Sequence, residues 1–232
     1  MLLVLSLAFS VMVFAGNVTT FGRKVLTYFK QNPQYHIGLL AETHLSQAMA
    51  DDEETRLQKL GMRGIHAHGQ TGPDLQAAEP ALGPAGGVKG GTAILAKRHL
   101  RVGSIPAAAR AELANDIAPC VVHLRGMKVL MVSAYLRPGL GLAGENLRRL
   151  QALGALVGAT RHPWIIHADW NLEPEELTAS QWLVLVGGSI MMPADIAGTC
   201  LRGQVRKLDY LVVGGGAERF VSGLSLAKDT PW

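Results

Sequence analysis

Short apolar runs that end in polar residues recur along the chain, and they predict buried strands. The clearest run starts at Trp164, and its apolar residues lead directly into Asp169 and Asn171. Because alternate residues of an extended chain share a side, this carboxylate and this carboxamide are expected to emerge together. Such a pair suits a hard cation held beside a phosphate oxygen, although Asp and Asn also favour ordinary turns.

Strands and helices are both expected. Apolar residues recur at every second position in some segments and at three- and four-residue steps in others. Strands are predicted at 1–15, 36–41, 92–96, 120–124, 128–135, 164–169 and 208–213, and helices after Thr19 or Thr20, after Ser46, across 147–157 and from Pro174. Hairpin pairs mix with strands separated by helices, which predicts an α/β (α+β) sandwich with mixed sheets. Residues 69–91, rich in Gly, Pro and Ala, are expected to form a loop within one domain spanning 1–232.

Composition agrees with one folded domain. The 232 residues are 48% hydrophobic and only 17% charged, which excludes a disordered chain. The net charge of +4 permits a polyanionic partner without requiring one. Cys120 and Cys200 have no metal-type spacing and are expected to be buried free thiols, as in an intracellular protein. We expect a monomer that does not associate with a membrane.

Residues 1–15 have two interpretations. An apolar run ending in Val13-Phe14-Ala15 could imitate a signal peptide, but it has no positive start and is too short to span a bilayer. A buried central strand is the favoured interpretation.

Two other chemistries are weakly indicated. Residues 139–144 fit G-x-G-x-x-G, yet the match lies mid-chain after a hairpin strand, with no acidic residue at the expected spacing. His66 and His68 share a strand face and could bind zinc, but no third ligand follows at a familiar spacing. Neither a dinucleotide site nor a zinc site is therefore preferred.

A third candidate site is distributed over the chain. Polar residues stand at the ends of five predicted strands, where one sheet edge would gather them: Asn17, Glu42, Tyr135, Asp169 with Asn171, and Asp209. A carboxylate such as Glu42 can hold Mg²⁺, and a phenol such as Tyr135 can donate to a developing oxyanion. Asp169 can orient or deprotonate a water, while the two amides can donate to a phosphate.

The sequences of these segments, and their order along the chain, resemble those of the endonuclease/exonuclease/phosphatase superfamily. The matching segments, in order, are Gly16-Asn17-Val18, Leu40-Ala41-Glu42-Thr43-His44-Leu45, Gly90-Gly91-Thr92-Ala93-Ile94-Leu95, Ser133-Ala134-Tyr135-Leu136-Arg137-Pro138, Ala168-Asp169-Trp170-Asn171 and Arg206-Lys207-Leu208-Asp209-Tyr210-Leu211. Their sequences are most similar to those of abasic-site and retroelement endonucleases. The resemblance implies a four-layer sandwich of two mixed β-sheets flanked by helices.

The resemblance also implies roles for single residues. Glu42 would be the principal Mg²⁺ ligand, with Mn²⁺ as a possible substitute, and Asn17 and Asp169 would support the metal site. Tyr135 and Asn171 would contact the scissile phosphate, and Asp169 would position or activate the water. Asp209 would orient a catalytic histidine near the C-terminus. DNA would be the substrate, a reverse transcriptase domain would follow downstream, and the protein would be nuclear.

Three departures from the family pattern matter. Ala168 replaces the usual Gly, Gly16 replaces a larger side chain, and no histidine follows Asp209, so the closing Ser-Asp-His-x-Pro signature is missing. The prediction is therefore a Mg²⁺-dependent DNA-nicking endonuclease that lacks its last segment, with activity lowered by ~10²–10⁴-fold or more. The alternatives are a degenerate family member that serves as a binding module or relic, and a phosphatase acting on a small phosphorylated ligand.

Overall fold

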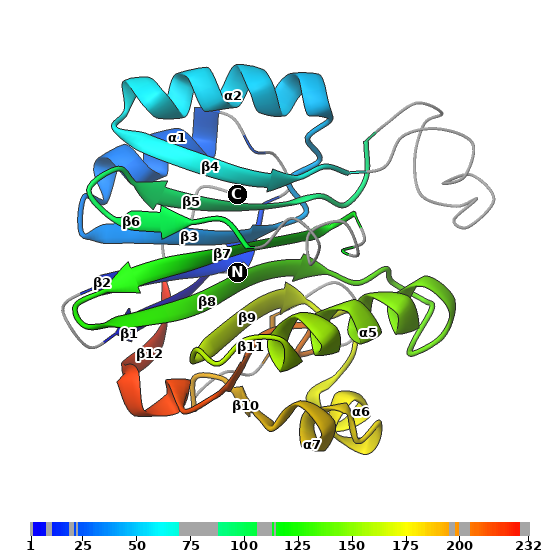
Figure 1. Ribbon diagram of the computed structural model, residues 1–232. Helices are drawn as coiled ribbons and strands as arrows, with labels where there is room; N and C mark the ends of the chain where they lie inside the picture. Colours follow the sequence, from blue (N-terminus) through cyan, green and yellow to red (C-terminus); the bar gives the residue numbers. More distant parts are fainter. Residues whose placement is uncertain are drawn as a thin grey trace.

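Two six-stranded mixed sheets pack face to face in the computed structural model, which describes residues 2–7, 11–18, 21, 23–69, 88–105, 113, 115–194, 198–199 and 205–227 (Figure 1). The first sheet has the order β12-β1-β2-β3-β5-β4. Its strands are β1 (Leu2–Leu7), β2 (Val11–Asn17), β3 (Tyr35–Ala41), β4 (Met62–Ala67), β5 (Thr92–Lys97) and β12 (Val221–Ala227). Strands β2 and β3 are parallel, and the other neighbours are antiparallel.

The second sheet has the order β10-β11-β9-β8-β7-β6. Its strands are β6 (Arg101–Gly103), β7 (Ile117–Leu124), β8 (Met127–Tyr135), β9 (Trp164–Asp169), β10 (Gly188–Met191) and β11 (Asp209–Gly214). Strands β8 and β9 are parallel, and the other pairs are antiparallel. The parallel pair at the centre of each sheet directs its carboxyl ends to the same edge of the sandwich.

Helices cover the outer face of each sheet, so the predicted four-layer sandwich is confirmed (Figure 1). The first sheet carries α1 (Arg23–Gln31) and α2 (Gln47–Lys59), and the second carries α5 (Gly144–Gly158), α6 (Pro174–Ala179) and α7 (Trp182–Val186). A short 3₁₀ helix, η1 (Ala217–Phe220), follows β11. A separate apolar core fills each of the three interlayer spaces, and the inter-sheet core includes Val13, Ile94 and Met131.

One prediction for the N-terminal run was wrong. Residues 1–15 were expected to form one strand, whereas β1 and β2 form an antiparallel pair within it. A run of this length exceeds the usual five or six residues of a strand, so a hairpin buries it better. β2 does lie at the centre of its sheet, between β1 and β3. None of the helices within the described ranges is long and apolar enough to cross a membrane.

Most other predicted elements are confirmed. The hairpin around Arg125-Gly126, the helix from Pro174 and the strand after Leu208 all occur as expected. Cys120 is a buried free thiol, whereas Cys200 lies outside the described residues. Most of the predicted loop at 69–91 also lies outside them.

A buried ion-pair network ties α5 to the loop before β5. The Arg149 Nη2 atom donates to Asp116 Oδ2 at 2.5 Å and to Glu145 Oε1 at 2.8 Å, and both Arg149 and Asp116 are buried. Asp116 Oδ1 accepts from the Gly91 amide. Since burial raises the pKa of Asp116, its charge depends on Arg149 for compensation.

His167 is fully buried in β9, and neither of its ring nitrogens has a hydrogen-bond partner among the described residues. Its neighbour in β8 is Ser133, which donates its hydroxyl across the sandwich to the Leu40 carbonyl. Burial lowers the pKa of His167 to about 3, so the folded chain keeps this ring neutral. The unfolded chain protonates it near pH 6.5.

We expect Arg149→Met to cost about 3–5 kcal/mol of unfolding free energy, because it leaves Asp116 buried without a cation. Asp116→Asn should also destabilise, and the double variant should cost less than the sum of the two single variants. Urea unfolding of the two single variants and the double variant gives this coupling. The matched control is Arg148→Met, an exposed neighbour on α5 that should shift stability by less than about 0.5 kcal/mol. Strictly additive costs would contradict the coupling.

Stability should fall as the pH falls from 6.5 toward 3, because only the unfolded chain binds a proton at residue 167 in this range. His167→Leu should remove about 3 kcal/mol of the stability lost between pH 7.5 and pH 4.5. Urea unfolding at the two pH values measures this loss. His162→Leu, at a half-buried surface position, is the control and should keep the full loss. An unchanged pH dependence in His167→Leu would refute the assignment.

Candidate active site

The six predicted site residues lie along one edge of the sandwich, which we call the rim. Asn17 ends β2, Glu42 directly follows β3, and Asp169 ends β9. Tyr135 ends β8 beside Asp169, and Asp209 begins β11 as the antiparallel partner of Asp169. The strand ends are fixed to one another because the Leu136 amide donates to the Asp169 carbonyl at 2.9 Å.

Asp169 lies at the centre of the rim and joins the two sheets. Asn17 Nδ2 donates to Asp169 Oδ2 at 2.8 Å, and this bond connects β2 of one sheet with β9 of the other. The Asn171 amide donates to Asp169 Oδ1 at 3.2 Å, while Asn171 Nδ2 donates to the Leu136 carbonyl at 2.8 Å. Both oxygens of Asp169 are therefore held, and its side chain has a fixed orientation.

The backbone around Glu42 is strained and is held by a glycine turn. Glu42 and His44 have φ values of 55° and 51°, which L residues with side chains rarely adopt. The Thr43 and His44 amides donate to the carbonyls of Gly91 and Gly90 at 3.1 and 2.8 Å. A Cβ atom at Gly90 would lie 2.6 Å from Asp116 Oδ1, so the turn requires glycine and rests directly on the buried network.

Neighbouring carboxylates raise the pKa values of Asp169 and Asp209. Burial, Asp209 and Glu42 raise the pKa of Asp169 well above its usual range, against the hydrogen bond from Asn17. Burial, and to a smaller extent Glu42, raises the pKa of Asp209 to about 6. A cation among these groups would relieve the repulsion, because it favours the charged form of each carboxylate.

The remaining rim residues are held mainly by backbone contacts. The Tyr135 amide donates to the Asp116 carbonyl at 3.0 Å, and its side chain is buried. The hydroxyl of Thr199 accepts from the Leu208 and Asp209 amides at 2.7 and 2.9 Å, which fixes the start of β11. Asp209 Oδ1 is buried and has no partner among the described residues.

The donor set suits Mg²⁺ better than a softer metal. Glu42, Asp169 and Asp209 supply hard oxygen ligands, and Asn17 Oδ1 is buried with no partner in the described chain. Within the described ranges, no three His, Cys, Asp or Glu side chains converge closely enough to enclose a metal by themselves. Mg²⁺ needs no such cage, since it keeps several waters and binds one or two carboxylates together with substrate phosphates.

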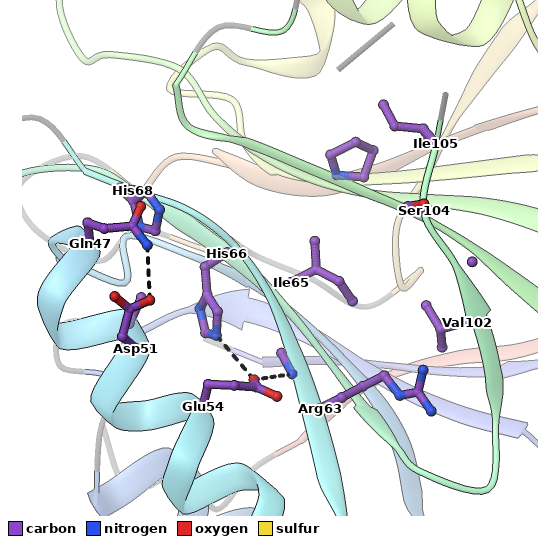
Figure 2. Close-up of a pocket in the computed structure, with 14 residues that line it drawn as sticks. Gln47, Asp51, Glu54, Arg63, Ile65, His66, His68, Val102, Ser104 and Ile105 are labelled. Atoms are coloured by element: carbon purple, nitrogen blue, oxygen red, sulfur yellow. Dashed lines mark hydrogen bonds and ion pairs between the residues drawn. The ribbon is translucent and has the colours of Figure 1, made fainter. Parts of the chain in front are cut away.

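The histidines of the zinc alternative line a different hollow, of about 410 Å³, between α2, β4 and β6 (Figure 2). His66 Nε2 lies 4.0 Å from Glu54 Oε2, and Figure 2 shows His68 near Gln47 and Asp51 instead. Burial lowers the pKa of His66 to about 4, so its ring is neutral at pH 7. The zinc interpretation gains no support from this arrangement.

Sequence reasoning missed the residues that support the rim. Asp116, Arg149 and Thr199 each hold a rim segment, although none lies in a motif. The one signal in the sequence was Arg149 itself, a charged residue at a position of α5 where the helical spacing predicts an apolar side chain. Its buried position shows that the helix faces a polar group.

Comparison with solved structures gives the same fold. The endonuclease domain of TRAS1, a telomere-specific non-LTR retrotransposon, aligns with a TM-score of 0.59 and 16% identity, covering 87% of this chain and 84% of that one. The 3′ phosphatase NExo from Neisseria, bound to a product DNA hairpin, has a TM-score of 0.55 and 15% identity over 87% and 86%. An AP endonuclease from Archaeoglobus fulgidus has a TM-score of 0.53 and 15% identity over 89% and 88%.

Sequence comparison is consistent with this likeness. No curated protein is similar enough in sequence to match the chain. Residues 18–230, however, match the family described as Endonuclease/Exonuclease/phosphatase. This match includes five of the six rim residues and spans most of the 232 positions. The chain belongs to the endonuclease/exonuclease/phosphatase family.

Proposed function

We propose that this chain is a Mg²⁺-dependent phosphodiesterase that nicks one strand of DNA, of the retroelement endonuclease type. The observation that carries the proposal is the convergence of Glu42, Asp169 and Asp209 on one rim, with Asn17 bonded to Asp169 across the two sheets. Members of its family are hydrolases of phosphate esters, and the DNA-acting neighbours named above support DNA as substrate. A monomer and a downstream reverse transcriptase domain remain part of this proposal.

Glu42 would be the principal ligand of the metal, with Asn17 Oδ1 and Asp169 completing the protein's share. When bound, Mg²⁺ supplies positive charge that offsets the negative charge of the phosphate and the rim carboxylates, and Mn²⁺ could substitute. The strained backbone at Glu42 supports this role, since such strain collects at functional sites.

Asp169 would be the proton-handling group. In the reaction a water oxygen bonds to phosphorus while the P–O3′ bond breaks, which leaves a 3′-hydroxyl and a 5′-phosphate. The central position of Asp169 on the rim, between Asn17 and Asp209, suits a carboxyl that takes the proton from the water or returns it to the leaving oxygen. Asn17 and the Asn171 amide hold that carboxyl in one orientation. Tyr135 and Asn171 would contact the scissile phosphate.

A second candidate is a family member that binds nucleic acid without cleaving it. No histidine follows Asp209 in the 232 residues, and Asp209 Oδ1 has no partner in the described chain. In the family pattern that carboxylate orients a histidine. This oxygen, without a partner in the described chain, is the observation that motivates the second candidate.

We expect Mg²⁺-dependent nicking of supercoiled plasmid that EDTA abolishes. Glu42→Gln and Asp169→Asn should each lower the rate by ~10²–10⁴-fold, because each removes a group that acts on the reacting phosphate. Arg148→Gln, an exposed change on α5, is the matched control and should retain the wild-type rate. Measuring the nicked fraction over time tests all four chains.

Nicking that persists in both site variants would refute the residue assignment. Absence of nicking by the wild type, together with intact binding of DNA, would favour the non-catalytic candidate. Cleavage of a small phosphate monoester without nicking would instead indicate a phosphatase.

A further inference from the structure

The end of the sandwich opposite the rim carries several Lys, Arg and His side chains. The turns between β5 and β6 and between β7 and β8 lie at this end, on the left in Figure 1, while β4 and β8 point to the right. We call six residues of this end the basal stripe: Lys97, Arg98, Arg101, His123, Lys128 and His162.

The stripe spans the connection between the two sheets. Lys97 faces the α1 side of the first sheet, whereas Arg101, His123 and Lys128 lie on the outer face of the second. Lys97 and Arg98 begin the turn that leads to Arg101 in β6. Arg101 pairs with His123 of β7, and His123 pairs with Lys128 of β8. These cross-strand partners share one face of the sheet at spacings of about 5 Å.

Two shallow hollows extend the stripe at its ends. His123, Lys128 and His162 line a hollow of about 540 Å³. Lys97 lines a second one, of about 250 Å³, together with Lys30 and His99. Positive groups therefore continue beyond the strands on both sides.

The charge of the stripe is not compensated locally. In the described part of the chain, none of its Lys or Arg side chains forms an ion pair with a carboxylate. The described turns at this end, at 31–34, 60–61, 98–100, 125–126, 159–163 and 215–220, contain one acidic residue, Glu218.

The crowding of basic groups affects the histidines at this end. Desolvation, Arg101, Lys128 and His162 together lower the pKa of His123, and desolvation, Lys97 and His99 lower that of His36. Lys30 and Lys59 lie in the last turns of α1 and α2, where the helix dipole stabilises a positive charge. The cations on the strands have no such stabilisation.

We propose that the basal stripe binds the phosphate backbone of a nucleic acid segment, separate from any segment at the rim. Lys and Arg side chains gathered at one end of the sandwich match the dense negative charge of nucleic acid, whose binding releases counterions. A membrane surface fits less well, since peripheral binding also needs apolar side chains to insert. The described turns at this end contain one exposed large apolar residue, Leu60.

Binding of a fluorescent 30-bp duplex by the full chain in EDTA tests the proposal, because no cleavage is needed. The variant Arg98→Gln/Lys128→Gln should weaken binding about tenfold and lower the slope of log Kd against log salt by about 2. The matched control, Lys24→Gln/Arg148→Gln, removes the same charge from the exposed surfaces of α1 and α5 and should change binding less than about twofold. Equal weakening by both pairs would overturn the proposal.

A second measurement locates the contact directly. After photo-crosslinking to a duplex that contains 4-thiothymidine, mass spectrometry should find nucleic acid attached to peptides spanning 97–101 and 123–128. Crosslinks confined to the peptides around Glu42 and Asp169 would overturn the proposal, as would binding to phosphatidylserine vesicles without binding to DNA. Because the assay uses no metal, it can succeed or fail independently of the nicking activity.

Discussion

The apolar layer between the two sheets is the constraint on which the rim depends. Strands β2, β3, β8 and β9 bury residues against one another in this layer, and each central parallel pair sends its carboxyl ends the same way. Polar residues at those strand ends therefore lie together at the shared edge. The Asn17–Asp169 hydrogen bond closes the edge, so a carboxylate from one sheet is oriented by an amide from the other.

The rim is maintained against unfavourable local terms. Asp209 and Glu42 raise the pKa of Asp169, and Glu42 and Asn171 occupy left-handed backbone conformations. Arg149 offsets part of this cost from a distance: it holds Asp116, which holds the Gly91 amide of the turn that positions Glu42. Such an arrangement stores strain where binding of a cation and a phosphate would release it.

Sequence patterns predicted mixed sheets and the polar residues at the strand ends, because both follow from local rules, whereas the four layers were implied by the family resemblance. Apolar runs identify strands, and the polar residue that ends a run identifies the edge, as at Asp169 and Asn17. The patterns failed where the outcome depends on distant parts of the chain. The length of residues 1–15 favours a hairpin, but no local pattern shows that β1 also pairs with the distant β12. Asp116 and Arg149 lie 33 positions apart, and no local spacing predicts their contact.

The burial of Cys120 has a consequence for the chemical reactivity of the chain. Its thiol lies in the inter-sheet layer, and burial raises its pKa to about 12. A thiol reagent needs an exposed thiolate, so the native chain should be inert at this position for as long as the sheets stay together. In a chain whose other cysteine, Cys200, is replaced, alkylation would follow the opening of the sandwich, and its rate would equal the opening rate at reagent concentrations that outpace reclosing. Cys120 is thus a built-in reporter of sheet separation at the very layer that assembles the rim.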